Sequence, residues 1–145
     1  MATLTRRRFL ATAGVGGVGA TILLAEPAWA PPKKPLVTTG AASLVTSSGA
    51  RLNGTVNPKG SATTYRFDYG PTTAYGTSTP NVSAGSGSTA VAVSAAISGL
   101  SSGTLYHFRI QATNAGGTSL GTDATFITQS AGGSVWPTVW PTVWP

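Results

Sequence analysis

Hydrophobic and polar positions alternate with a period of two through most of the chain between residues 36 and 128. The clearest stretch follows Thr104, where one face carries Tyr106, Phe108, Ile110 and Ala112 and the other carries Leu105, His107, Arg109 and Gln111. Strict alternation among aromatic and β-branched residues predicts a half-buried antiparallel strand. Gly103 before the stretch and Asn114–Gly117 behind it supply the turns.

The same alternation predicts six further strands, within Leu36–Val45, Ala50–Asn57, Thr64–Gly70, Tyr75–Val82, Ala90–Ile97 and Ser119–Thr128. Turn signals separate them: we expect a break at Gly40, a turn at Pro58–Gly60, an edge position at Pro80 and a loop at Ala84–Ser88. The inward positions are expected at Leu52, Val56, Tyr65, Phe67, Tyr69, Val91, Val93, Ala95, Ile97, Ala124 and Phe126. Seven strands with no helix between them predict a two-sheet sandwich around one core.

Two phrases of this pattern resemble the fibronectin type III family. Leu100 precedes Tyr106 at the spacing of a tyrosine corner, in which the tyrosine hydroxyl returns to the backbone just upstream. Residues 65–76 are similar to the third strand and the following turn of bacterial members, although Leu52 stands where the family often has tryptophan. The resemblance covers residues 36–128. It implies an all-β, seven-stranded, antiparallel Greek-key sandwich of the immunoglobulin-like class, with Leu100, Tyr106, Phe108 and Ile110 as its signature.

Residues 1–30 have the layout of an export signal: a cationic start, an apolar run diluted by glycines and an end of small residues. Arg6 and Arg7 followed by Phe9 and Leu10 resemble a twin-arginine signal, which implies the twin-arginine export machinery as a partner and an extracellular or cell-surface location. The apolar run of about fifteen residues is shorter than the roughly 20 that a membrane span needs. Cleavage after Ala25 and cleavage after Ala30 both remain open.

Two short segments flank the predicted sandwich. Pro31–Pro35 reads as an extended linker whose Lys33 and Lys34 either remain solvated or touch anionic wall polymers. Residues 129–145 form a low-complexity tail with a Val-Trp-Pro-Thr repeat, in which Trp136, Trp140 and Trp144 are candidate contacts for sugar rings or a membrane interface. The alternatives are a severed linker or a repeat without a role, and we expect one of these.

Composition leaves little room for catalysis. The chain has nine lysines and arginines, three acids, one histidine and no cysteine, which excludes disulfides and thiolate chemistry. His107 is expected to face outward with Arg66 or Asp68 as its neighbour across the sheet, and Asp123 to lie near a turn. We therefore expect no catalytic residue, no metal and no cofactor. The cations are scattered, apart from the Lys33–Lys34 pair, which argues against a nucleic-acid partner.

These observations predict an exported, monomeric, non-catalytic interaction or structural module of the bacterial cell surface or extracellular space. Such a module would bind a protein or polymer through the loops that follow its second, fourth and sixth strands. The alternative is an accessory spacer or carbohydrate-binding piece of a polysaccharide-degrading system, or a fragment of a larger multidomain protein. In that alternative the tail supplies the sugar platform.

Overall fold

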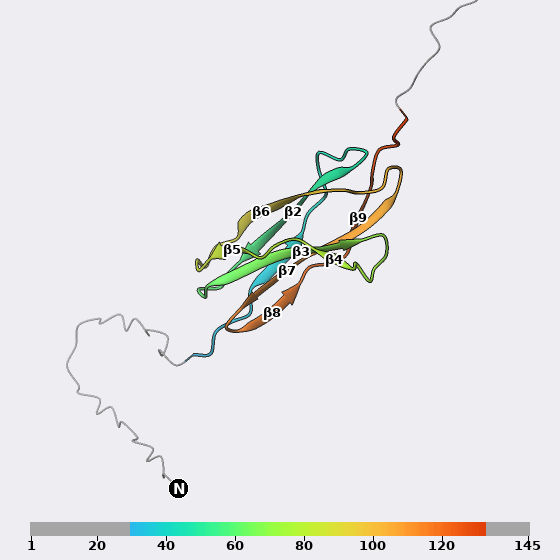
Figure 1. Cartoon of the computed structure of the whole chain (residues 1–145). Helices are drawn as coiled ribbons and strands as arrows, with labels where there is room; N and C mark the ends of the chain where they lie inside the picture. The colour runs from blue at the N-terminus through green and yellow to red at the C-terminus, as the bar shows by residue number, and fades with distance from the viewer. Residues whose placement is uncertain (1–29, 133–145) are drawn as a thin grey trace, which may run out of the picture. The chain divides into compact units, whose positions relative to one another are not determined.

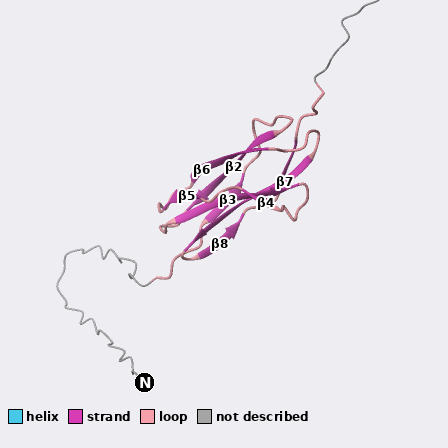
Figure 2. Cartoon of the chain, in the orientation of Figure 1, coloured by secondary structure: helices cyan, strands magenta, loops and turns pink. Residues whose placement is uncertain are grey.

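A computed structural model describes residues 30–132, which form two antiparallel sheets packed face to face (Figures 1 and 2). The strands are β1 (Leu36–Thr39), β2 (Gly49–Asn57), β3 (Thr63–Gly70), β4 (Thr77–Ser78), β5 (Val82–Gly85), β6 (Val91–Ser98), β7 (Leu105–Asn114), β8 (Gly117–Leu120) and β9 (Ala124–Ile127). Among these residues no helix is long and apolar enough to cross a membrane. The predicted all-β class is confirmed.

One sheet has the order β1-β2-β6 and the other β4-β3-β7-β8, with β5 also paired to β3 and β9 to β7. The long pairings are β2 with β6, from Gly49↔Ser98 to Val56↔Val91, and β3 with β7, from Thr64↔Thr113 to Gly70↔His107. Because β2 continues into β3, β5 into β6 and β6 into β7, the chain crosses between the two sheets three times. This is the predicted Greek-key sandwich of the immunoglobulin-like class.

The fourth and last predicted strands are each divided in two. Thr79 lies between β4 and β5 and makes two hydrogen bonds to Phe67 on β3. Its N–H donates to Phe67 O and its hydroxyl accepts from Phe67 N, both at 2.9 Å. Gly121 separates β8 from β9, since its N–H donates to Ile110 O at 2.8 Å and a Cβ there would collide with the Thr39 hydroxyl.

One smaller expectation was wrong. Ala84 and Gly85 do not begin a loop, because β5 extends through them and Gly85 pairs with Thr63. Val91 lies on the inward face as predicted, opposite the buried Val56, but it is 37% exposed because it is the first residue of β6, which lies at the edge of its sheet. By contrast, the expected break at Gly40 is confirmed, since β1 ends at Thr39.

The core lies between the sheets and draws on both. Its buried apolar members are Ala50, Leu52, Val56, Tyr65, Phe67, Ile97, Tyr106, Phe108, Ile110, Ala112 and Phe126. Phe126 packs against two other aromatic rings of the core, since its ring centre lies 5.6 Å from that of Tyr106 and 5.8 Å from that of Phe108. Burying a large apolar side chain contributes about 1.5–3 kcal/mol, so this set is the main source of stability.

A tyrosine corner fixes the connection between β6 and β7. The hydroxyl of Tyr106 accepts a hydrogen bond from Ser101 N at 3.0 Å, and Leu100 packs against the core. Thr128 closes the same corner from the end of β9, because its hydroxyl donates to Ser101 O at 2.6 Å and accepts from Thr104 N at 2.9 Å. The crossover is therefore tied to two strands of the second sheet.

Candidate functional site

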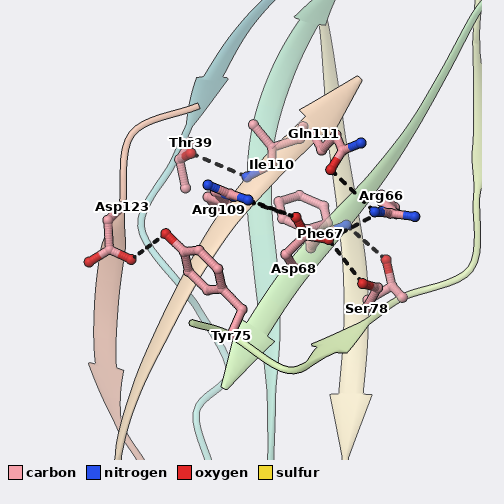
Figure 3. A network of polar contacts seen from close by, with 11 residues as sticks. Thr39, Arg66, Phe67, Asp68, Tyr75, Ser78, Arg109, Ile110, Gln111 and Asp123 are labelled. Carbon is pink, nitrogen blue, oxygen red and sulfur yellow. Dashed lines mark hydrogen bonds and ion pairs between the residues drawn. The ribbon is translucent and has the colours of Figure 1, made fainter. Parts of the chain in front are cut away.

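A polar network lies on the outer face of the six-stranded sheet (Figure 3). Alternation along β3 turns Tyr65 and Phe67 inward and leaves the intervening side chains outside. The register of β3 and β7 then sets Asp68 beside Arg109 and Arg66 beside Gln111. We call this group, together with His107, Tyr75, Ser78 and Asp123, the sheet-face network.

Asp68 is the centre of the network and is only 6% exposed. Its carboxylate accepts hydrogen bonds from Ser78 Oγ at 2.9 Å, from Arg66 Nε at 3.1 Å and from Arg109 Nε at 3.4 Å. A buried carboxylate is costly unless it is paired and hydrogen-bonded, and these three donors from three strands meet that condition. Asp68 therefore ties β3, β4 and β7 together.

Tyr75 folds back over this face from the turn between β3 and β4. Its φ is +60°, its N–H donates to Thr72 O at 2.9 Å, and a Cβ at Gly70 would collide with its carbonyl. The Arg109 guanidinium lies 4.5 Å from the Tyr75 ring centre, a cation–π distance. The phenol donates to Asp123 Oδ1 at 2.9 Å. Desolvation, and after it the hydrogen bond and charge of Asp123, raise the pKa of Tyr75.

His107 does not have the neighbour that was expected. Its partners across the sheet are Gly70 on β3 and Thr125 on β9, and its Nδ1 lies 2.8 Å from Asp123 Oδ2. The expectation of Arg66 or Asp68 was wrong because β7 pairs those residues with Gln111 and Arg109. Desolvation opposes the charge on Asp123, but the hydrogen bonds from His107 and Tyr75 outweigh it and lower the pKa of that carboxyl.

The network surrounds a shallow depression of about 280 Å³ lined chiefly by Arg66, Asp68, Tyr75, Thr77, Ser78 and Arg109. Its two arginines and two aspartates cancel in formal charge and are bonded to one another or to neighbouring side chains. Within residues 30–132 no three histidines or acids gather as metal ligands. These contacts hold the β3–β4 turn, which carries Tyr75, against the outer face of the sheet.

A second grouping lies at one end of the sandwich, where the β2–β3, β5–β6 and β7–β8 loops meet the segment before β1. Gly60 N donates to Gly87 O at 2.9 Å, which joins the first two loops. The side-chain amide of Asn114 donates to Lys33 O at 3.0 Å and to Pro58 O at 3.1 Å, which joins the third loop to the first and to the N-terminal segment. We call residues 32–34, 57–61, 85–90 and 114–117 the loop end.

The loop end carries exposed lysines at positions 33, 34 and 59. Lys59 occupies the tip of the β2–β3 turn with φ +57°, and its N–H donates to Asn57 Oδ1 at 3.0 Å. The stem of Lys34 lies over Gly117. The Lys33–Lys34 pair was visible in the sequence, but Lys59 joins it only through the fold. Tyr75 and the His107–Asp123 contact likewise had no local signal.

The remaining candidate residues are not brought to either grouping. Leu100, Tyr106, Phe108 and Ile110 belong to the core and its corner. The export residues Arg6, Arg7, Phe9 and Leu10, and the tail residues Trp136, Trp140 and Trp144, lie outside the described residues. The functions predicted for them remain predictions.

No protein-family model and no curated protein matches the chain. Among solved structures, two of the sensor domain of the anti-sigma factor RsgI4 in Pseudobacteroides cellulosolvens are similar. One is 22% identical, with 70% of this chain and 98% of that one covered and a TM-score of 0.53. The other is 20% identical, with 74% and 89% covered and a TM-score of 0.53. The third fibronectin III domain of human KIAA0343 protein is 18% identical, with 84% of this chain and 98% of that one covered and a TM-score of 0.45. The likeness to the sensor domain supports the β-sandwich fold.

Proposed function

We propose that the chain is an exported, non-catalytic binding module that contacts its partner through the loop end. The observation that carries this proposal is the joining of three loops and the N-terminal segment by the Asn114 amide and the Gly60–Gly87 bond. Loops held in fixed positions by a rigid scaffold are the usual place for binding residues, because little ordering entropy is lost on contact.

The loop end suits a partner better than the sheet face does. A ligand at the sheet face would compete with hydrogen bonds that Asp68, Arg66 and Arg109 already make to one another. At the loop end, a Cβ added at Gly60 or Gly87 would meet no atom within 4 Å. This surface is open, and a partner can approach its backbone.

Export is supported by the arginine pair at residues 6 and 7 and the glycine-diluted apolar run behind it. Replacing both Arg6 and Arg7 with lysine should leave the precursor in the cytoplasm, as followed by cell fractionation and immunoblotting. Arg8→Lys is the matched control, since Arg8 falls between the pair and Phe9, and it should be exported normally. Unchanged export of the double variant would contradict the twin-arginine assignment.

Steric blocking tests the loop end without assuming the chemistry of the partner. Gly87→Phe places a bulky side chain in open space at the loop end, whereas Thr73→Phe places one at an exposed position in the β3–β4 turn. We expect the first variant of the full chain to bind purified cell walls several-fold more weakly than wild type and the second to bind normally. Equal binding by both variants would count against the loop end as the contact surface.

A spacer role is the second candidate, and the course of the chain favours it. The described chain enters the sandwich at the loop end, where Lys33 O meets Asn114, and leaves at the other end, where Gln129 N donates to Thr46 O at 3.0 Å (Figure 1). A module with entry and exit at opposite ends separates whatever precedes it from whatever follows it. The two roles are compatible in one molecule.

A further inference from the structure

The charges of the sandwich are unevenly distributed between its surfaces. Residues 30–132 contain six lysines and arginines and two aspartates, a net charge of +4 with His107 neutral. Arg66 and Arg109 are balanced within the sheet-face network by Asp68 and Asp123. The remaining cations are Arg51, exposed on β2 of the other sheet, and the three lysines of the loop end. Three of the four uncompensated charges thus share one end.

Hydrogen bonds fix the backbones that bear these lysines. One amide nitrogen of Asn114 contacts both the carbonyl of Lys33 and the carbonyl of Pro58, the residue before Lys59. A Cβ at Gly116 would collide with the Pro32 carbonyl, so the N-terminal segment packs closely on the β7–β8 turn. Lys33 and Lys34 therefore belong to the folded end of the sandwich and not to a free tether.

We infer that the loop end binds a flexible polyanion whose carboxylate or phosphate groups repeat along the chain. This inference rests on the proposed function and adds the class of partner. Within residues 30–132 the two acids, Asp68 and Asp123, both belong to the sheet-face network and not to the loop end. Clustered lysines attract such a chain over a distance and gain affinity by releasing its counterions. Lysine is a flexible point charge, which suits anions that are not fixed in one geometry.

The residue types at the loop end favour a plain polyanion over single-stranded nucleic acid. Proteins that hold single strands combine a cationic groove with aromatic side chains on which the bases stack. The loop end contains proline, glycine, serine, threonine, alanine, asparagine and lysine, and no aromatic residue. It offers charge and hydrogen bonding to a polymer but no stacking platform.

Salt-dependent binding to two defined polymers tests the inference. Polygalacturonate presents carboxylates and polyphosphate presents phosphates, so a preference would identify which oxyanion is favoured. With three cations and about 0.7 counterions released per contact, the logarithm of the binding constant should fall with the logarithm of salt at a slope of about −2. Affinity of the full chain should therefore drop roughly 15-fold between 50 and 200 mM salt.

Variants then locate the effect. Lys33→Ala, Lys34→Ala and Lys59→Ala combined should weaken binding to both polymers at least several-fold, whereas the combined lysine-to-arginine variant should bind like wild type. Arg51→Ala removes one exposed cation from another surface and should bind like wild type. Unchanged binding by the triple alanine variant, or tighter binding to oligo-dT than to either polymer, would overturn the inference. A different result separates the two proposals. If Gly87→Phe weakens cell-wall binding while the triple alanine variant does not, the loop end is supported as a binding surface and the inference of a polyanionic partner is contradicted.

Discussion

At the scale of single residues, Asp68 and Tyr75 show how the sheet face is stabilised. Asp68 is buried and receives three donors from three strands, and Tyr75 covers Arg109 while its hydroxyl reaches Asp123. Each charge is compensated by a neighbour, so no strong unpaired field is left on this face. The polarity of the sheet face is therefore explained by stability alone.

Tyr106 should contribute more to stability than its neighbour His107. Tyr106→Phe removes the acceptor of the Ser101 N–H inside a partly buried corner, which costs about 1–2 kcal/mol. His107→Ala removes one partly exposed contact with Asp123, which costs less than about 1 kcal/mol. Urea denaturation of both variants measures the two free energies of unfolding. A larger loss for His107→Ala would show that the network, and not the corner, secures β7.

Asp123 should make stability depend on pH in the acid range. Its pKa lies below the ordinary 3.8 in the folded chain, so its contribution is present above that value and is lost as the pH falls through the folded pKa. The difference in unfolding free energy between wild type and Asp123→Asn should be present at about pH 5 and should shrink below 3.8. Thr122→Ala serves as the pH-independent control. A difference that grows in acid would contradict the assignment.

At the scale of elements, the alternating pattern was sufficient to locate the strands but not their interruptions or partners. The buried faces of β3 and β7 were predictable from the apolar residues Tyr65, Phe67, Phe108 and Ile110, because a two-residue period allows only one inward set on each strand. The division at Thr79 depends on its hydroxyl accepting a hydrogen bond from Phe67 N on β3, which no local pattern encodes. The neighbour of His107 could not be predicted for the same reason, since the register decides it.

The turn between β3 and β4 should depend on glycine at position 70. A Cβ there would collide with the Tyr75 carbonyl, so Gly70→Ala should displace the turn, break the Tyr75–Arg109 contact and cost about 2–3 kcal/mol. Gly87→Ala is the matched control, because its Cβ would meet no atom within 4 Å and should change stability by less than about 0.5 kcal/mol. Thermal melts followed by circular dichroism compare them. Equal melting temperatures would exclude a structural role for this close approach.

At the scale of the whole molecule, the described residues form one sandwich with its entry and its uncompensated lysines at one end and its exit at the other. The sequence predicted the sandwich correctly and identified the lysine pair, whereas the export signal and the role of the tail remain predictions. It could not show that Lys59 joins that pair, because only the fold brings the carbonyls of Lys33 and Pro58 to the same Asn114 amide. The proposed contact surface is therefore a property of the tertiary structure.

Removing residues 135–145 should not alter the sandwich. The buried core consists of residues 50–126, and a proline-punctuated repeat is a poor strand partner, so the melting temperature should be unchanged. Retention on cell-wall glycans, chitin and cellulose should be unchanged as well. Loss of retention on deletion, or a blue shift of indole fluorescence when a polysaccharide is added, would instead favour the accessory role in polysaccharide degradation.

The most direct test of the central claim is to observe which backbone amides respond when a polyanion binds. Polygalacturonate is titrated into the isotope-labelled full chain, and the amide resonances are followed by two-dimensional NMR. We predict shifts at residues 33–34, 59–61, 85–90 and 114–117, with the amides of Arg66, Asp68 and Arg109 unaffected. Shifts centred on β3 and β7, with the loop-end amide resonances unchanged, would contradict the account.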